Sequence, residues 1–293
     1  MPSSFMNYVT PKCCCISIMK RENVKFKGSL LAFDVDGTLL NSQGQLTERT
    51  VIAISSARDK GATVILATGR SWSELQYVID AIPDIEYAIC TNGLEAYNRL
   101  GEVLYTEQIQ PDLAGELVAT IRSSIHGVAI GAGIGSELFA EPKVIEGLVP
   151  GIEITSDRLV DDIAQVLISD VRDLLIYHPS YVNKLDDLLT KVKDVIVDDR
   201  VDIVYSGLPM IEIVPAGSGK GTCLAWLAQQ LELKQENVFA FGDGMNDISM
   251  LKWAGIGIAM GQSHQRVKAS ADLIIGSVDE EGIAEWIENN LSN

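Results

Sequence analysis

Two carboxylates that could take part in catalysis or metal binding lie two residues apart near the start of the chain. Asp34 and Asp36 follow the apolar residues 30–33 and precede Gly37, a pattern typical of a strand that ends in an acidic loop. Side chains two residues apart on a strand project to the same side, and glycine permits a sharp turn after them. Such close carboxylates repel each other unless a cation lies between them or one carries a proton, and both arrangements suit an active site. An ordinary Asp-Gly turn is the alternative that these residues leave open.

A second acidic loop follows a later apolar run, residues 238–241. Gly242 precedes Asp243, and Asn246 and Asp247 complete a second group of oxygen ligands. Taken alone, this segment fits the start of a helix with Asp247 next to its N-terminus. If both acidic loops lie at one edge of a sheet, however, their excess of negative charge requires a hard cation, and carboxylate oxygens suit Mg²⁺. The two loops together therefore predict a magnesium site.

Groups that can hold an anion lie in two further segments. Thr68, Gly69 and Arg70 follow the apolar residues 62–67 and offer a hydroxyl, backbone N–H groups and a cation before a helix. Lys220 starts a helical pattern, where its ammonium can neutralise an anion. Neither segment alone predicts an anion-binding site. Together with the two acidic loops, the two segments indicate a site for an anion beside the metal.

Residues 216–222 (AGSGKGT) also resemble a nucleotide-binding P-loop. An apolar strand precedes them, a helix follows, and glycine precedes Lys220 in the expected order. A Walker loop carries another glycine several residues before its Gly-Lys pair, whereas residues 214–216 here are Val, Pro and Ala. Nucleotide binding therefore stays an alternative to the anion-neutralising role of Lys220.

Apolar strands alternate with amphipathic helices at both ends of the chain. Strands are expected at residues 62–67, 87–91, 211–214 and 238–241. Strands that are apolar on both faces predict a parallel sheet that helices cover on both sides. Ligands bind beyond the carboxyl ends of such strands, where Asp34, Thr68 and Asn92 all lie.

The pattern changes in the middle of the chain, where glycines and Pro142, Pro150 and Gly151 interrupt the long elements. Helices are expected there at residues 111–125, 159–167 and 181–192, and strands at 174–177, 195–197 and 201–205. We therefore predict a poorly ordered tail at 1–27, a core domain formed by 28–107 and 209–293, and an α+β module inserted between them at 108–208.

The composition excludes several classes of partner. With 40 Asp and Glu against 23 Lys and Arg, the net charge is −17, and the average field repels nucleic acid and anionic membranes. No apolar run approaches the ~20 residues that span a bilayer. Five cysteines, including the run at residues 13–15, form no C-x-x-C pair, which favours a reducing compartment and a cytoplasmic location. We expect a monomer or a weak homodimer that acts on a small metabolite.

Four segments in this order resemble the four motifs of the haloacid dehalogenase (HAD) superfamily. They are residues 34–38 (DVDGT), Thr68, Lys220, and the loop from Gly242 to Asp247. The long insertion between the second and third segments, with ATGR at 67–70 and TNG at 91–93, is similar to the Cof-type sugar-phosphatase branch and its type IIB cap. The resemblance covers residue 28 to the C-terminus. It implies an α/β fold, with a Rossmann-like parallel-sheet core and an inserted α+β cap domain.

The resemblance also implies roles for the acidic residues. Asp34 would be the nucleophile that forms an aspartyl phosphate, and Asp36 would protonate the leaving group and then deprotonate the attacking water. Mg²⁺ would be bound by an Asp34 oxygen, the Asp36 backbone carbonyl and Asp243, with Asp247 supporting it directly or through water. The metal would allow two anions, carboxylate and phosphate, to meet.

The remaining motif residues would bind the phosphoryl group. Thr68, Gly69 and Lys220 would hold its oxygens, Asn246 would help to orient it, and Arg70 is a weaker candidate for the same contact. The implied function is a Mg²⁺-dependent phosphatase acting on sugar phosphates or related small phosphomonoesters, and flavin phosphates, pyridoxal phosphates and a riboflavin-pathway intermediate stay open. A phosphomutase or phosphotransferase with the same nucleophile is the alternative, ahead of a P-loop nucleotide-binding protein and of a non-catalytic binding protein.

Overall fold

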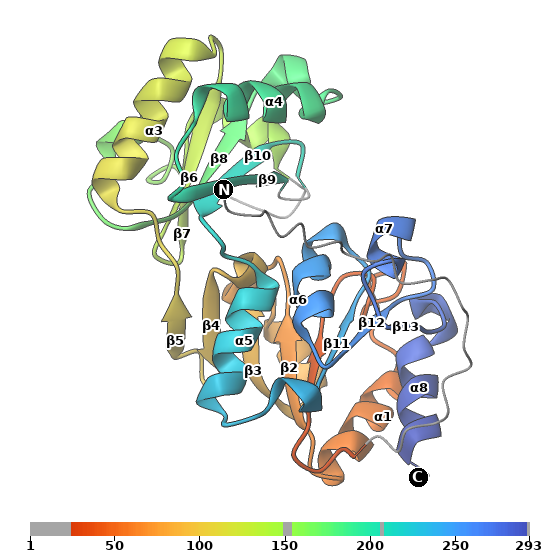
Figure 1. Cartoon of the computed structure of the whole chain (residues 1–293). Coiled ribbons are helices and arrows are strands. Elements are labelled where there is room, and N and C mark those ends of the chain that lie inside the picture. The colour runs from red at the N-terminus through yellow and green to blue at the C-terminus, as the bar shows by residue number, and fades with distance from the viewer. Residues whose placement is uncertain (1–24, 149–153, 206–207, 292–293) are drawn as a thin grey trace, which may run out of the picture.

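Two β-sheets organise the protein (Figure 1). The computed structural model describes residues 25–148, 154–205 and 208–291, and these form a sheet of eight strands and a sheet of five. The larger sheet has the order β13-β12-β11-β1-β2-β3-β4-β5. Its strands are β1 (Leu30–Phe33), β2 (Thr63–Ala67), β3 (Ile85–Cys90), β4 (Glu95–Asn98), β5 (Val103–Thr106), β11 (Val238–Gly242), β12 (Ile256–Ala259) and β13 (Leu273–Ile274).

The order of the larger sheet creates a switch point beside its first strand. From β13 to β3 all neighbours run parallel, and β4 and β5 add an antiparallel hairpin at one edge. The chain builds outward from β1 through β2 and β3 on one side, and later through β11 and β12 on the other. Ligands bind at the carboxyl edge of an open α/β sheet where the strand order reverses in this way. The loops after β1 and β11 therefore meet at the position where a site is expected.

Helices cover both faces of the larger sheet, as the apolar strands predict. One face packs against α1 (Glu48–Asp59), α2 (Gln76–Ala81) and α8 (Gly282–Leu291), and the other against α5 (Lys220–Gln230), α6 (Ile248–Trp253) and α7 (Gln265–Lys268). Helix α1 shows how local residues set the ends of these helices. The Thr47 side chain accepts a hydrogen bond from the Thr50 N–H at its start, and Gly61 follows its end at φ +91°.

The five-stranded sheet and its two helices form a separate α+β unit. Its order is β7 (Glu137–Ala140), β6 (Ala129–Ile134), β8 (Val171–Tyr177), β10 (Ile211–Pro215) and β9 (Val201–Tyr205), with antiparallel neighbours throughout. Helices α3 (Pro111–Ser124) and α4 (Leu185–Val195) pack on one face through a shared apolar cluster. In Figure 1 these helices lie on the side away from the larger sheet.

The chain returns from the five-stranded sheet to the larger sheet later than the sequence predicts. The strand at residues 211–214 was expected in the core, but β10 pairs with β8 and β9 in the five-stranded sheet. Ile211 and Ile213 are buried against the helices of that sheet. An apolar strand can satisfy either sheet, so its composition does not reveal which neighbours it joins. The chain therefore returns to the larger sheet only between Pro215 and Lys220.

Two elements of the insertion differ from expectation. No α-helix forms among the described residues 159–167; a single 3₁₀ turn spans Ile163–Gln165, because the Asp162 side chain accepts a hydrogen bond from the Ala164 N–H and pairs with Arg122. The strand expected at 195–197 is also wrong. Helix α4 instead extends to Val195, because Leu188 and Val192, four residues apart, lie on its buried face.

Other expectations fall at or beyond the limits of the described residues. Phe26, which we assigned to the N-terminal tail, is buried in the core of the larger sheet. The cysteine run at residues 13–15 and the interruptions at 150 and 151 lie outside the described residues. Cys90 and Cys223 are buried free thiols. In the described part of the chain, no helix is both long and apolar enough to span a bilayer, and the expected cytoplasmic location stays a prediction.

The close contact between β12 and α6 predicts a sharp difference between two glycine substitutions. A Cβ added at Gly257 would lie 2.0 Å from the Leu251 carbonyl oxygen, whereas one at Gly115 in α3 would meet nothing within 4 Å. We expect Gly257→Ala to lower the free energy of unfolding by about 1–3 kcal/mol. Gly115→Ala should raise it by about 0.5–1 kcal/mol, because alanine favours a helix. Urea denaturation of the three proteins measures both effects, and an unchanged Gly257→Ala midpoint would contradict the packing described.

Candidate active site

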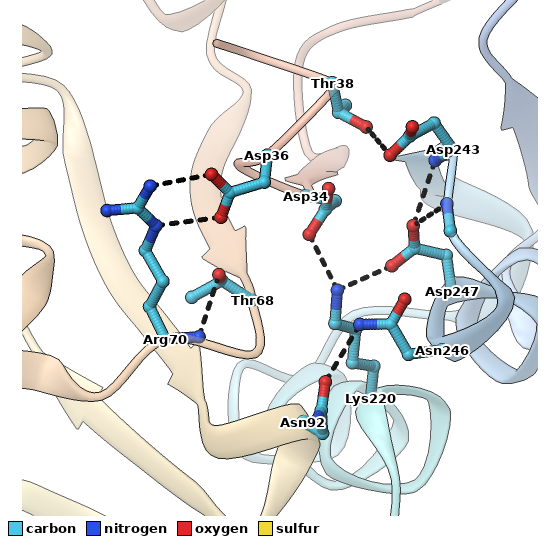
Figure 2. A network of polar contacts seen from close by, with 11 residues as sticks. Asp34, Asp36, Thr38, Thr68, Arg70, Asn92, Lys220, Asp243, Asn246 and Asp247 are labelled. Carbon is cyan, nitrogen blue, oxygen red and sulfur yellow. Dashed lines mark hydrogen bonds and ion pairs between the residues drawn. The ribbon is translucent and has the colours of Figure 1, made fainter. Parts of the chain in front are cut away.

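A buried lysine joins the two acidic loops (Figure 2). Lys220, the first residue of α5, donates hydrogen bonds from Nζ to Asp34 Oδ1 at 2.7 Å and to Asp247 Oδ1 at 2.6 Å. The side chains of Lys220 and Asp247 are fully buried, and that of Asp34 is 8% exposed. A buried ammonium is stable only when negative charge and hydrogen-bond acceptors surround it. Lys220 therefore fixes the loop after β1 to the loop after β11.

Asp247 also organises the backbone of its own loop. Its Oδ2 atom accepts hydrogen bonds from the N–H groups of Asp243 at 2.9 Å and Gly244 at 2.8 Å. Both oxygens of Asp247 are thus bound by groups of the protein. The contact directs the Asp243 side chain across the site, where its Oδ1 accepts a hydrogen bond from Thr38 Oγ1 at 3.4 Å. Asp247 consequently holds the loop in place around Asp34 and Asp243.

Two glycines permit the close approach of these loops. Gly37 has φ +79°, and a Cβ there would lie 2.4 Å from Asp243 Oδ2. Gly93, in the turn after β3, has φ +99°, and a Cβ there would lie 2.3 Å from the backbone of Gly219, the residue before Lys220. Other residues are strained at such φ angles. The glycines that the sequence places in these loops therefore position Asp243 and Lys220.

The electrostatic environment follows from burial and from the excess of carboxylates. Burial raises the pKa of Asp34 to about 7, the charge of Asp247 adds to the effect, and Lys220 opposes it. Burial and the charge of Asp247 raise the pKa of Asp243 to about 6. Burial alone would lower the pKa of Lys220, but Asp247 and Asp34 outweigh burial and raise that pKa above its usual range. Lys220 thus stays charged, but its single positive charge does not keep the pKa values of Asp34 and Asp243 in their usual range.

The donor set fits a hard divalent cation. One ligand atom each from Asp34, Asp243 and Asp247 lie within 4.8 Å of one another. Three carboxylates face one ammonium, so a dication would balance the charge, and oxygen ligands suit Mg²⁺. Because Lys220 and two backbone N–H groups already bind the oxygens of Asp247, Asp34 and Asp243 offer the better placed ligands.

Asp36 has different surroundings from Asp34. Its carboxylate forms a two-point ion pair with Arg70, with Nε to Oδ2 at 2.8 Å and Nη2 to Oδ1 at 2.6 Å. The Asp36 side chain is 58% exposed. Asp34 and Asp36, two residues apart in the sequence, thus have separate partners. Arg70, which we expect to contact phosphate, is bound to Asp36.

The other predicted residues lie around this centre. Thr68 is fully buried at the end of β2, and its hydroxyl accepts a hydrogen bond from the Arg70 N–H at 3.1 Å. A Cβ at Gly69 would lie 3.0 Å from Asn92 Oδ1, so Gly69 keeps that loop close to the site. Asn246 Nδ2 donates to Asn92 Oδ1 at 2.9 Å, on the Lys220 side of the cluster in Figure 2. The structure therefore brings all the predicted site residues to one sheet edge.

Three further residues contribute contacts to the site. Asn92, which the sequence places at this sheet edge, binds Asn246; Thr38 donates to Asp243, and Gln262 Nε2 donates to the Gly37 carbonyl oxygen. Sequence reasoning assigned no role to Thr38, although it belongs to the first acidic motif. Gln262 follows β12 and matched no motif.

The P-loop interpretation of residues 216–222 is not supported by the topology. Strand β10 before this segment belongs to the antiparallel five-stranded sheet, whereas helix α5 after it packs on the larger sheet. The Lys220 ammonium is committed to two buried carboxylates. The segment is the return crossing between the sheets, and its glycines serve that crossing.

Comparison with known proteins identifies the family. The profile of haloacid dehalogenase-like hydrolases matches residues 31–287. The chain belongs to the haloacid dehalogenase-like hydrolase family. The same residues hold both acidic loops, Lys220 and all of the five-stranded sheet, so the HAD match includes the complete site.

Named relatives cover most of this HAD chain. It is 30% identical over 281 residues to the 5-amino-6-(5-phospho-D-ribitylamino)uracil phosphatase of Bacillus subtilis, covering 92% of this chain and 98% of that protein. It is 29% identical over 282 residues to the chloroplastic endoribonuclease YBEY of Arabidopsis thaliana, covering 90% of this chain but only 46% of that longer protein. The match to the longer protein is thus a match to part of it.

A solved structure shows the same architecture. A phosphatase of the HAD superfamily from Bacteroides thetaiotaomicron superposes with a TM-score of 0.75 at 26% identity, covering 94% of this chain and 99% of that one. The predicted family and fold class, a parallel-sheet core with an inserted α+β cap, are confirmed. The predicted enzyme class, a HAD-type phosphoric monoester hydrolase, agrees with the phosphatases among these HAD proteins.

The raised pKa of Asp34 predicts how the stability of the metal-free protein depends on pH. The folded carboxyl, with a pKa of about 7, keeps a proton that the unfolded chain, with a pKa of 3.8, has released. Stability should therefore fall as the pH rises from about 4 to about 7, because the folded state binds more protons in that window. The urea midpoint in chelator should show this loss, and Asp34→Asn should reduce it. An equal pH dependence in wild type, Asp34→Asn and the exposed control Asp59→Asn would contradict the assignment.

Proposed function

We propose that the protein is a Mg²⁺-dependent phosphatase that hydrolyses small phosphomonoesters through an aspartyl phosphate on Asp34. The observation that carries this proposal is the buried Lys220 ammonium, which orients Asp34 Oδ1 and leaves its second oxygen without a contact to Lys220. A carboxylate held in this way is a nucleophile that splits hydrolysis into two displacements. The phosphatase relatives support the same reaction class.

The metal fits the residues that would hold it. Asp34, Asp243 and the Asp36 backbone carbonyl would supply its protein oxygens, and Asp247 would hold the loop and Lys220 in position. When bound, Mg²⁺ supplies positive charge that allows the carboxylate and the phosphate to approach.

Asp36 is the general acid and base. Its exposed carboxylate lies at the mouth of the site, where it protonates the leaving oxygen and then removes a proton from water. In this structure Arg70 holds both of its oxygens, so catalysis requires Asp36 to leave that ion pair or to share it. An Arg70 guanidinium released from Asp36 would be free to contact a phosphoryl oxygen, as the sequence predicts.

The phosphoryl oxygens are held by groups that lie around Asp34. Lys220 provides the buried positive charge, and the Thr68 hydroxyl and the Gly69 N–H would donate to phosphoryl oxygens, because the Thr68 N–H already donates to the Ile89 carbonyl oxygen. Positioning and neutralisation of charge are most of what phosphoryl transfer requires from a protein. A phosphomutase or phosphotransferase would use the same nucleophile but would need an acceptor, so release of inorganic phosphate in water discriminates between the reactions.

The nucleophile is tested by replacing its carboxylate. Asp34→Asn keeps the size of the side chain but removes the attacking charge, so we expect at least about a 1,000-fold loss of phosphate release from phenyl phosphate with Mg²⁺. Asp59→Asn, the same change at an exposed position, should retain full activity. Wild-type protein should release phosphate without any acceptor. Undiminished turnover by Asp34→Asn would contradict the proposed mechanism.

The metal site is tested through Asp243. Mg²⁺ should raise the melting temperature of the wild type, because a ligand that binds the folded state stabilises it. Asp243→Asn should need at least about 10-fold more Mg²⁺ for half of that shift, since one charged ligand is lost. Asp59→Asn serves again as the control. An Asp243→Asn protein with wild-type dependence on Mg²⁺ would show that the ion binds elsewhere.

A further inference from the structure

A cavity between the two sheets adjoins the site. It has a volume of about 620 Å³, and it is lined by residues of β9, β10 and α4 on one side and by residues near α5, α6 and α7 on the other. Asn92 and Asn246, which bind each other beside Lys220, form part of its wall. A phosphoester whose phosphate lies at Asp34 would place its leaving group toward this cavity.

Two buried polar atoms in this cavity lack a partner. Among the residues that the structure describes, three buried side-chain atoms have no hydrogen-bond partner: Glu212 Oε2, Ser218 Oγ and Ser263 Oγ. Glu212 and Ser218 both line the cavity, and Glu212 is only 6% exposed. Buried polar atoms are normally satisfied, because an unsatisfied one destabilises the folded protein. Their concentration in one cavity beside the site indicates a ligand with matching groups.

The neighbours of Glu212 do not explain its unpartnered oxygen. The nearby cation is Arg172, but Arg172 already pairs with Asp173 at 3.3 Å and with Glu95 at 3.6 Å, and it donates to the Gly135 carbonyl oxygen. Burial and the charge of Asp173 raise the pKa of Glu212 to about 8, against the effect of Arg172. The Glu212 carboxyl is therefore largely neutral at pH 7 in the free protein and still offers an acceptor oxygen, and binding an anion beside it and Asp173 would be unfavourable.

The other walls limit what the cavity can hold. Ile203, Val214 and Ile248 contribute apolar surface, and the half-exposed Tyr205 and Met245 stand at its opening. The cationic side chains that line it are Lys193, Lys252 and Arg266. In a chain of net charge −17, these three cations favour the entry of an anionic ester. The apolar walls suit the carbon skeleton of a leaving group.

We propose that Glu212 and Ser218 determine substrate specificity by binding hydrogen-bond donors, N–H or O–H groups, on an uncharged or cationic part of the leaving group. This inference rests on the proposed phosphatase function and names the class of its substrates. Esters of polyols, sugars or amino-substituted rings meet the requirement. Esters whose leaving group presents a second anion to Glu212, or no donor at all, do not.

Two matched pairs of esters test the inference. Glucose 6-phosphate and cyclohexylmethyl phosphate share a six-membered ring and a primary ester, but only the first has hydroxyls on the ring. 4-Aminophenyl phosphate and phenyl phosphate differ in one amino group. Wild-type protein should favour the donor-bearing member of at least one pair by about 10-fold or more in kcat/KM. Glu212→Leu and Ser218→Ala should each reduce that preference, mainly through a higher KM for the donor-bearing ester.

Controls separate recognition from structural damage. Glu212→Gln keeps the shape and one acceptor, and it should retain more of the preference than Glu212→Leu. Glu116→Gln, at a side chain that is 72% exposed, should leave all four kcat/KM values unchanged. A purely structural role of Glu212 would lower both members of a pair equally, and that result would overturn the inference, as would a wild type with no preference in either pair. Failure of the wild type to hydrolyse any of the four esters with Mg²⁺ would overturn the proposed function as well.

Discussion

A fully buried lysine ammonium has to be matched by buried negative charge, and the catalytic edge of this protein is arranged around that requirement. Lys220 meets Asp34 and Asp247, which lie 186 and 27 residues away in the sequence. Breaking a buried pair leaves an uncompensated charge, at a cost of roughly 3–5 kcal/mol. The three residues therefore act as one unit, in which the position of each side chain depends on the other two.

The topology of the chain explains how this unit forms. Strands β1 and β11 are neighbours, so the two acidic loops meet at the switch point of the larger sheet. Lys220 follows the return crossing from the five-stranded sheet, which places the start of α5 between that sheet and the acidic loops. Asp243 adds a third carboxylate without adding a cation, and the resulting excess of negative charge suits a dication. The acidic cluster and the cavity between the sheets thus share the crossing that carries Ser218 and Lys220.

The sequence revealed the site better than it revealed the inserted domain. Asp34, Thr68, Lys220 and Asp243 all follow strands or start a helix of the larger sheet, and parallel strands bring such positions to one edge whatever the exact length of each element. Strand β10 was assigned to the wrong sheet because pairing partners are not encoded in apolar composition. The ion pair of Asp36 with Arg70 and the unpartnered Glu212 depend on three-dimensional neighbours, so spacing alone could not reveal them.

The most direct measurement of the central claim is the identification of the residue that becomes phosphorylated during turnover. Wild-type protein is mixed with Mg²⁺ and a phosphomonoester, quenched within milliseconds in acid, digested and analysed by peptide mass spectrometry. The account predicts a single phosphoryl group on the peptide that contains Asp34, absent when Mg²⁺ is omitted. Steady release of phosphate with the phosphoryl group on another residue, or with none bound to the protein at any quench time, would contradict it.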